Sequence, residues 1–334
     1  MRAAVYRRRG AAHDVFELID IATPTPGPGE IRVRLAASAI NPSDVKGRQG
    51  RSSGQGGAEE GLPWPLQIPH QDGAGIIDAV GDEADRPRIG RPAWVYHAAD
   101  RRPDGTAAQW VVLPRDQVVD LPPGIPMSQA AAIGIPYMTA HRCLFADGPL
   151  DGLTVLVTGG AGAVGNAAIQ LARWAGARTI TTVSGASKAD IASGAGVDAV
   201  VDYTAADVTE QLAAAAPDGI DRVVDVALTF NLPTYESLLN DHAVVAAYAE
   251  IDGRTGGAWP PPMRLRVRNV TLRMVRAYGL TGAMLDAAAS DITAALAAGA
   301  LRPLPTHHFP LDAIADAHAA VEAGLVGKAI VDIP

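Results

Sequence analysis

One glycine-rich turn constrains the fold of this chain more than any other segment. The stretch VLVTGGAGAVGN (Val155–Asn166) joins a short apolar run to an Ala-rich segment, AAIQLARWAGA. Gly160, Gly162 and Gly165 have the spacing G-x-G-x-x-G, and here this spacing follows an expected strand and opens an expected helix, which is the context that gives it meaning. The first glycine allows a tight turn, the second lets the backbone approach a pyrophosphate, and the third lets the helix pack close to the strand. We therefore predict a dinucleotide-binding turn.

The segments around this turn indicate a parallel sheet. From about Met127, apolar runs such as TVLVTG, TITTVS and RVVDV alternate with Ala-rich helical segments. This alternation is typical of βαβ units, with helices on both faces of a doubly wound α/β sheet of the Rossmann type. The unpaired N–H groups at the start of the helix would bind the phosphates. The expected cofactor contacts at this turn are Gly160, Gly162, Ala163, Val164 and Gly165.

The end of the second expected strand bears on which dinucleotide binds. NAD sites usually carry Asp or Glu ~20 residues past the glycines, where it accepts from the ribose 2′-OH. Here the strand Arg178–Val183 is followed by Ser184-Gly-Ala-Ser-Lys188, without a carboxylate. Two charge-assisted hydrogen bonds from Ser184 and Lys188 to a 2′-phosphate would favour NADPH by very roughly 10²–10⁴. The alternative for Lys188 is an ordinary exposed helix lysine.

The N-terminal part of the chain has a different texture. In residues 1–122, short apolar runs alternate with Pro and Gly, and few helical periods occur, which predicts an all-β region. Within it, GRQGRSSGQGGAEEGLPWP (Gly47–Pro65) is rich in Gly and Ser and predicts a mobile surface loop.

Composition excludes several classes of function. The formal net charge of −8 disfavours a nucleic-acid partner. No run approaches the ~20 apolar residues that a membrane helix needs, and MRAAVYRRRG at the N-terminus is too polar for a signal peptide. A single cysteine, Cys143, rules out an intrachain disulfide and a multi-Cys zinc lobe. These features predict a cytoplasmic protein with no nucleic-acid or membrane partner.

Four segments carry a resemblance to a known family. They are AASAINPSDVKGRQG, IPHQDGAGIIDAVG, AAAIGIPYMTAHRCLF and LVGKAIVDI. With them the chain resembles the medium-chain dehydrogenase/reductase superfamily, and more closely its zinc-independent quinone oxidoreductases, the zeta-crystallin group. His70 stands where that group usually has glycine. The resemblance implies a β-rich GroES-like catalytic domain of residues 1–122 and 279–334, a Rossmann NADPH-binding domain of residues 123–278, and an active site in the cleft between them. It also implies a homodimer joined along Val270–Tyr278.

In the zinc alcohol dehydrogenases, the same segments carry the catalytic metal ligands. The corresponding positions here are Asn41, Gln71 and Ile135. Zinc takes thiolate, imidazole or carboxylate ligands, and these three side chains offer none. We expect no metal. Without a metal to stabilise an alkoxide, hydride transfer from NADPH suits an acceptor that is already electron-poor, such as a quinone.

The resemblance also implies individual site residues. Thr139 would contact the nicotinamide, Tyr203 would flank the 2′-phosphate, and Lys328 would approach the cofactor phosphates. Asn41 would donate to an acceptor oxygen, or it is simply a turn residue before Pro42. Further candidates for the catalytic set and the acceptor pocket are Gln71, Tyr137, Trp64, Arg276 and Tyr278.

The reaction that these expectations favour is NADPH-dependent reduction of a quinone-like acceptor. Reduction of an activated C=C bond in an enal or enone remains open, because nothing in the expected pocket separates the two. A third alternative is an NADPH-binding protein without turnover, with a redox-sensing or structural role.

Overall fold

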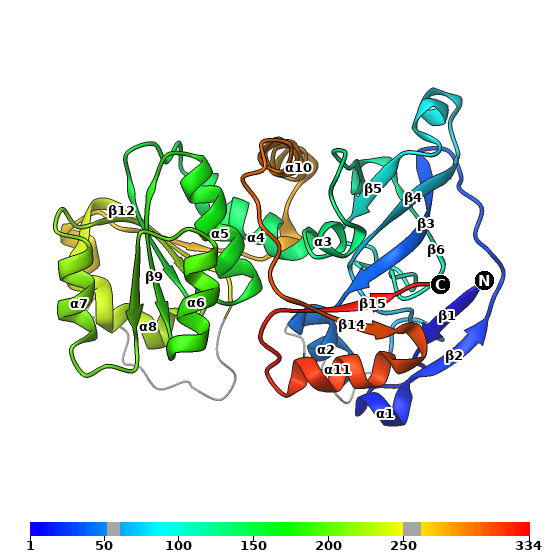
Figure 1. Ribbon diagram of the computed structural model, residues 1–334, viewed down its shortest axis with the longest axis horizontal. Helices are drawn as coiled ribbons and strands as arrows, with labels where there is room; N and C mark the ends of the chain where they lie inside the picture. The colour runs from blue at the N-terminus through cyan, green and yellow to red at the C-terminus, as the bar shows by residue number, and fades with distance from the viewer. Residues whose placement is uncertain (52–60, 250–261) are drawn as a thin grey trace. The chain divides into compact units, whose positions relative to one another are not determined.

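The computed structural model describes residues 1–51, 61–249 and 262–334 (Figure 1). The chain divides into two compact units, Met1–Ile135 with Pro305–Pro334, and Pro136–Leu304. No helix in these described ranges is long and apolar enough to cross a membrane.

The second unit is built on a six-stranded sheet in the order β10-β9-β8-β11-β12-β13, with every pair parallel. The strands are β8 (Thr154–Thr158), β9 (Arg178–Val183), β10 (Ala199–Asp202), β11 (Ile220–Asp225), β12 (Leu239–Ala247) and β13 (Thr271–Met274). Numbered within the sheet, this order is 3-2-1-4-5-6, which is the Rossmann arrangement. The predicted doubly wound α/β class is confirmed.

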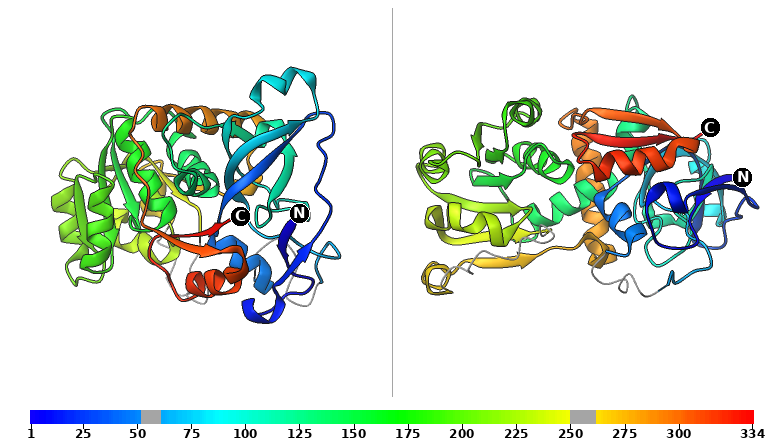
Figure 2. Two further views of the ribbon diagram at one scale, coloured as in Figure 1. Left: turned by 45° about the vertical axis from the view of Figure 1, so that its right-hand side comes forward. Right: turned by 90° about the horizontal axis from the view of Figure 1, so that it is seen from below.

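Helices cover both faces of this sheet (Figure 2). The helices in this part of the chain are α4 (Gly134–Phe145), α5 (Ala163–Trp174), α6 (Ala186–Gly194), α7 (Val208–Ala215), α8 (Leu228–Tyr235), α9 (Pro262–Val267) and α10 (Gly282–Ala297), with the 3₁₀ turns η3 (Glu236–Leu238) and η4 (Ala277–Gly279). Only part of the segment Val270–Tyr278, along which the resemblance implies a homodimer, is a strand, since β13 ends at Met274 and the chain turns at Ala277. Because β13 pairs only with β12 among the described strands, it forms an edge of the sheet.

The first unit contains a seven-stranded sheet in the order β14-β15-β3-β4-β5-β7, with β6 also paired to β3. The strands are β3 (Glu30–Ala39), β4 (Asp72–Val80), β5 (Pro92–Val95), β6 (Trp110–Pro114), β7 (Val118–Asp120), β14 (Thr306–Pro310) and β15 (Lys328–Asp332), beside a hairpin-like pair, β1 (Arg2–Val5) and β2 (Glu17–Asp20). Ile330 of β15 pairs with Ala39 of β3, so the C-terminal segment completes the N-terminal sheet.

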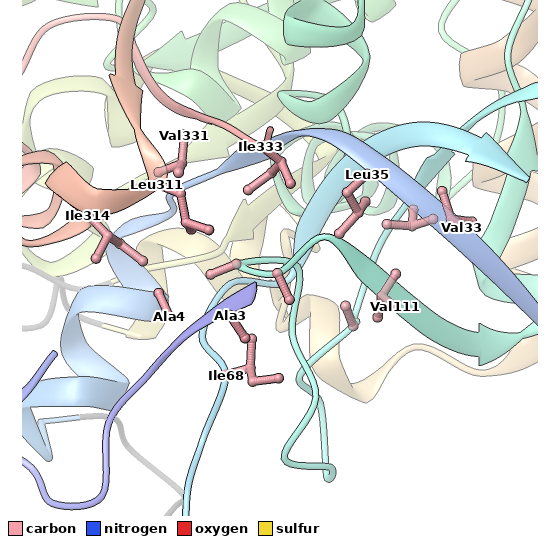
Figure 3. Packing of buried hydrophobic residues seen from close by; sticks show 14 of the residues in the cluster. Ala3, Ala4, Val33, Leu35, Ile68, Val111, Leu311, Ile314, Val331 and Ile333 are labelled. Carbon is pink, nitrogen blue, oxygen red and sulfur yellow. The ribbon is translucent and has the colours of Figure 1, made fainter. Parts of the chain in front are cut away.

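Alternation along β3 explains the core of this unit. Ile31, Val33 and Leu35 are buried, while the intervening Arg32 and Arg34 are not. Burial of alternate residues is what a strand with one face on the core requires. Figure 3 shows side chains from β1, β3, β15 and the helix α11 (Ile314–Glu322) packed together, including Leu35 and Val331.

The all-β prediction for residues 1–122 is wrong where short helices interrupt the strands. Helices α1 (Ala12–Val15) and α2 (Pro42–Gln49) lie in this region, with the 3₁₀ turns η1 (Glu83–Arg88) and η2 (Arg115–Gln117). Asn41 is the N-cap of α2, the proline at N1 has the φ that a helix start needs, and Gly50 ends the helix at φ 73°. Part of the expected Gly47–Pro65 loop is therefore helical, and its residues 52–60 lie outside the described residues.

The remaining helices of the first unit show why its boundaries differ from the predicted domain boundaries. They are α3 (Met127–Ala131), the 3₁₀ turn η5 (Leu311–Ala313) and α11 (Ile314–Glu322). Helix α3 contacts β3, β4 and β5, so residues 123–135 pack with the first unit, while α10 contacts α5 of the second. The predicted boundaries lay after residues 122 and 278. Which residues form the functional domains stays a prediction.

Candidate functional site

The glycine turn between β8 and α5 has no room for side chains at two of its three fingerprint positions. A Cβ on Gly160 would lie 2.2 Å from Thr181 Oγ1 of β9, and one on Gly165 would lie 2.3 Å from the carbonyl oxygen of Gly159. A Cβ on Gly162 would meet only that carbonyl oxygen, at 3.4 Å. Gly160 and Gly165 are therefore required by packing within the protein, whereas Gly162 leaves its side open to a ligand.

The start of α5 offers unpaired donors. Gly162 is the N-cap and has no side chain to cap the helix, and the Asn166 N–H donates to its carbonyl oxygen at 2.8 Å. The N–H groups of Ala163, Val164 and Gly165 precede that first helical bond and have no partner within the helix. Together with the helix dipole, they form an anion-binding site. The turn thus fits the pyrophosphate of a dinucleotide.

The ends of β9 and β10 bring three more of the predicted cofactor residues, Ser184, Lys188 and Tyr203, to the same edge of the sheet. Lys188 Nζ donates to Ser184 Oγ at 2.9 Å, and both side chains are half-buried. The Tyr203 N–H donates to the Val183 carbonyl oxygen at 3.0 Å, and its ring is 39% exposed. The Tyr203 ring meets that of Phe230 edge-on, with the centroids 6.5 Å apart. Sequence reasoning did not single out Phe230.

Sequence reasoning also missed a carboxylate at this edge. Asp202 ends β10 and pairs in register with Val183, and its Oδ2 accepts from the Gly185 N–H at 3.1 Å. The prediction of NADPH rested on the residues after the strand Arg178–Val183 alone. The sequence signal for Asp202 is that a carboxylate ends the next apolar run, which forms β10. Parallel pairing places the ends of β9 and β10 side by side, so Asp202 lies beside the turn after β9.

Helix α4 carries Tyr137 and Thr139. Thr139 is 5% exposed. The Tyr137 hydroxyl shares a hydrogen bond with the Gln170 side chain of α5, and burial raises the pKa of the Tyr137 phenol well above its ordinary value. Gln170 also donates to Asn166 Oδ1 at 2.7 Å, so Tyr137 is tied to the cofactor-side helix α5.

The first unit holds a buried polar cluster of Asn41, Asp44, Asp72 and Lys328. Lys328 Nζ donates to Asn41 Oδ1 at 2.5 Å, and Asn41 Nδ2 donates to Asp72 Oδ2 at 2.7 Å. The Asn41 backbone N–H donates to Asp44 Oδ2, also at 2.7 Å. Lys328 is 3% exposed and Asn41 2%. Sequence reasoning placed Lys328 near the cofactor phosphates and did not anticipate this cluster.

Burial controls the charge of the cluster. It raises the pKa of Asp72 to about 6, against the opposing effects of Lys328 and of hydrogen bonds from Asn41 and Ile135. It also raises the pKa of Asp44, and it lowers that of Lys328 while both carboxylates favour the ammonium. Two buried carboxyl groups therefore share one ammonium group, which is the cluster's source of positive charge.

The three positions that resemble zinc-ligand positions take part in protein hydrogen bonds. The Ile135 N–H donates to the Asp72 carboxylate at 3.0 and 2.9 Å, and Gln71 Oε1 accepts from the Ala99 N–H at 3.1 Å. Asn41 accepts from Lys328 as described. Among the described residues, no group of three His, Cys, Asp or Glu side chains is arranged to hold a metal ion.

The other predicted pocket residues belong to different units. Trp64 is half-buried in the first unit. In the second, the Arg276 guanidinium lies over the Tyr278 ring, 5.6 Å from its centroid, just after β13. Their roles toward an acceptor stay predictions.

A buried histidine pair is a further feature that sequence reasoning missed. His70 Nε2 and His318 Nε2 are 2.9 Å apart, and His70 Nδ1 is 2.8 Å from Ser38 Oγ. Both rings are at most 1% exposed. Since 248 residues separate the two histidines, no local pattern pointed to the contact.

We expect this pair to make the protein sensitive to acid. Burial and Lys328 lower the pKa of His70 to about 3, and burial, His70 and Arg48 lower that of His318. The unfolded chain therefore binds more protons below its His pKa of about 6.5, and the stabilisation present above that pH is lost as pH falls, by up to about 2 kcal/mol per histidine at pH 5.

The comparison that isolates this effect is with His318→Gln. Its free energy of unfolding, measured in denaturant, should fall less between pH 7 and pH 5 than that of the wild type. Asp44 and Asp72, whose raised pKa values act in the opposite direction, are the same in both proteins. His13→Gln, at an exposed site, should match the wild type. Parallel pH profiles for all three proteins would contradict the prediction.

Comparison with known proteins decides the family. The alcohol dehydrogenase GroES-like domain matches residues 27–123, and the zinc-binding dehydrogenase domain matches residues 195–331. The chain belongs to the medium-chain dehydrogenase/reductase family. The resemblance read from the four sequence segments is confirmed, as is the GroES-like character of the N-terminal region.

Three known proteins show how similar this chain is to individual members and relatives. Human quinone oxidoreductase is 28% identical over 93% of this chain and 91% of its own. The rat synaptic vesicle membrane protein VAT-1 homolog is 33% identical over 60% of this chain and 47% of its own, so the chain spans about half the length of that relative. The quinone oxidoreductase of Thermus thermophilus, whose structure is also known in complex with NADPH, has a TM-score of 0.78 at 26% identity and covers 99% of this chain and 100% of its own.

Proposed function

We propose that this medium-chain dehydrogenase/reductase is an NADPH-dependent reductase of quinones or similar electron-poor acceptors that works without a bound metal. The observation that carries the proposal is the shared sheet edge of the second unit. There, the unpaired N–H groups at the start of α5 and the Lys188–Ser184 pair at the start of α6 lie at the carboxyl ends of neighbouring strands. This arrangement suits a pyrophosphate and a further phosphate on one dinucleotide.

When bound, NADPH would supply the hydride. The chain's own part is to hold it. The N–H groups of Ala163, Val164 and Gly165 would compensate the pyrophosphate charge, and Lys188 with Ser184 would do so for the 2′-phosphate. We propose Thr139 as the residue beside the nicotinamide and Tyr203 as the ring that flanks the adenosine.

The chemistry of the residues at the metal-ligand positions supports an acceptor that needs no Lewis acid. Asn41, Gln71 and Ile135 carry no thiolate, imidazole or carboxylate. A quinone or activated alkene yields an oxyanion that a few hydrogen bonds can stabilise. We propose that Asn41 supplies one of them. Lys328 fixes the amide oxygen of Asn41, and Asp72 engages only one of its two amide N–H groups.

Steady-state oxidation of NADPH tests the function, with a panel of quinones and a panel of enones and enals, and NADH alongside. Faster turnover on the quinone panel supports the proposal, and faster turnover on the second panel makes the protein a C=C reductase. Binding of NADPH without turnover on either would point to a non-catalytic role. Activity should survive dialysis against a chelator, and its loss would overturn the metal-free proposal.

Lys188→Ala should weaken the binding of NADPH but not that of NADH. Loss of one charge-assisted hydrogen bond to the 2′-phosphate should raise the NADPH dissociation constant by about 10- to 100-fold, at about 1.5–3 kcal/mol. NADH lacks this phosphate and should bind nearly as before. Ser187→Ala, one residue away and exposed, is the control and should leave both constants unchanged. If Lys188→Ala weakens both coenzymes equally, Lys188 does not contact the 2′-phosphate.

A further inference from the structure

Asp202 lies at the turn where the 2′-phosphate is expected. The turn therefore has a negative charge beside the positive charge of Lys188. Val183 of β9 and Asp202 of β10 are register partners, so the two strands end together. Lys188, on the first turn of α6, places its ammonium on Ser184 Oγ. Asp202 places its carboxylate on the N–H of Gly185, the next residue along. A cation and an anion thus approach the same two-residue turn.

The carboxylate is held in place by three donors. Its Oδ2 accepts from the Gly185 N–H at 3.1 Å, and its Oδ1 accepts from the Thr204 N–H at 2.9 Å and the Thr204 hydroxyl at 2.7 Å. These hydrogen bonds favour the ionised form, and they lower the pKa of Asp202, the Thr204 hydroxyl having the largest effect. Asp202 is therefore a fixed negative charge at neutral pH.

Covalent geometry bounds how far this charge lies from the expected phosphate site. Gly185 N is joined to Ser184 Oγ through three atoms, so Asp202 Oδ2 lies within about 8 Å of Ser184 Oγ. This distance is close to the Debye length at physiological salt, so salt screens the repulsion between Asp202 and the phosphate only in part. NADPH carries an additional 2′-phosphate of about −1.5 to −2 charges, whereas NADH has a neutral hydroxyl in its place.

We propose that Asp202 is a specificity-determining residue that lowers the preference of the site for NADPH over NADH. Lys188 attracts the 2′-phosphate and Asp202 repels it, while the 2′-hydroxyl of NADH meets no such repulsion. The preference is then the balance of two opposed charges at one turn. This inference rests on the proposed function, because it takes the bound coenzyme to be a nicotinamide dinucleotide at the α5 turn.

Dissociation constants for NADPH and NADH, measured by calorimetry at about 0.01 M salt, test the proposal. Asp202→Asn should lower the dissociation constant of NADPH by about two- to fivefold, while the dissociation constant of NADH should change by less than about twofold. At 0.5 M salt the gain for NADPH should disappear, because screening removes the repulsion that the substitution relieves. Asp207→Asn is the matched control: this carboxylate accepts from Gln211 of α7 at 2.8 Å, whereas Asp202 accepts from Gly185 of the turn.

Asp202→Glu separates charge from shape. It retains the charge but displaces the carboxylate, so it should keep the wild-type ratio of the two constants. If Asp202→Glu and Asp202→Asn shift the ratio alike, or if the shift persists at 0.5 M salt, Asp202 only shapes the turn and the proposal is overturned. An unchanged ratio in Asp202→Asn also overturns it. Failure of the wild type to bind either coenzyme would instead reject the proposed function, and this inference with it.

Discussion

We expect Lys328→Met to lower the free energy of unfolding by about 3–5 kcal/mol, which is the usual cost of leaving a buried charge without its compensating partner. The substitution leaves Asp44 and Asp72 buried without the ammonium that compensates them, and leaves Asn41 Oδ1 without its donor. Methionine fills a similar volume, so the loss reflects charge rather than a cavity. Denaturant unfolding of both proteins, followed by circular dichroism, measures the difference.

The control is to measure the loss of unfolding free energy in Lys328→Met at two pH values. Burial already raises the pKa of Asp72 to about 6, above its value near 3.9 in the unfolded chain. A group of this kind stabilises the fold below its unfolded pKa, and that contribution is lost as pH rises through its folded pKa. Without Lys328 the pKa of the carboxyls rises further, so the deficit should be larger at pH 8 than at pH 5. Lys328→Met with Asp72→Asn should recover part of the stability at pH 8. An equal deficit at both pH values would contradict this account.

We expect Gly165→Ala to destabilise the second unit and to abolish the coenzyme binding proposed for this turn. Its new methyl group would lie 2.3 Å from the Gly159 carbonyl oxygen and 3.1 Å from the Gly160 Cα, and both neighbours are backbone atoms that cannot turn aside. Because the overlap can be relieved only by moving α5 away from β8, we expect the loss to reach or exceed about 3 kcal/mol, the upper end of ordinary overpacking. The N–H groups at the start of α5 would move with the helix. Thermal unfolding and calorimetric titration with NADPH give the two readouts.

Substitutions at two other glycines distinguish an effect on packing from an effect on coenzyme binding. Gly162→Ala meets only the Gly159 carbonyl oxygen at 3.4 Å, so it should fold normally yet weaken NADPH, since its methyl group points to the side where the pyrophosphate is expected. Gly194→Ala, in α6 with nothing within 4 Å of the new atom, should leave binding unchanged and add about 0.5–1 kcal/mol of stability. If Gly165→Ala binds NADPH as tightly as Gly194→Ala does, the turn does not hold the coenzyme.

Local patterns were sufficient for the Rossmann unit. Strand β9 has the bounds that its apolar run predicted, and the glycine spacing predicted the turn before α5. Both depend on neighbours in the chain: a strand that is buried on both faces reads as a continuous apolar run, and a tight turn needs glycine wherever backbone approaches backbone. The helix α2 was missed although its signals, Asn41, Pro42 and Gly50, are also local, because the Gly-rich stretch that follows dominated the interpretation.

The amino-acid sequence by itself determined the order of strands and helices, the glycine turn and the family. Tertiary structure alone decided which polar groups meet: Lys328 with Asn41 across 287 positions, His70 with His318, and Asp202 with the turn after β9. The physical reason is that periodicity and turn chemistry act over a few residues. Burial of a charge and the register of paired strands, in contrast, are set by segments that meet only when the chain has folded.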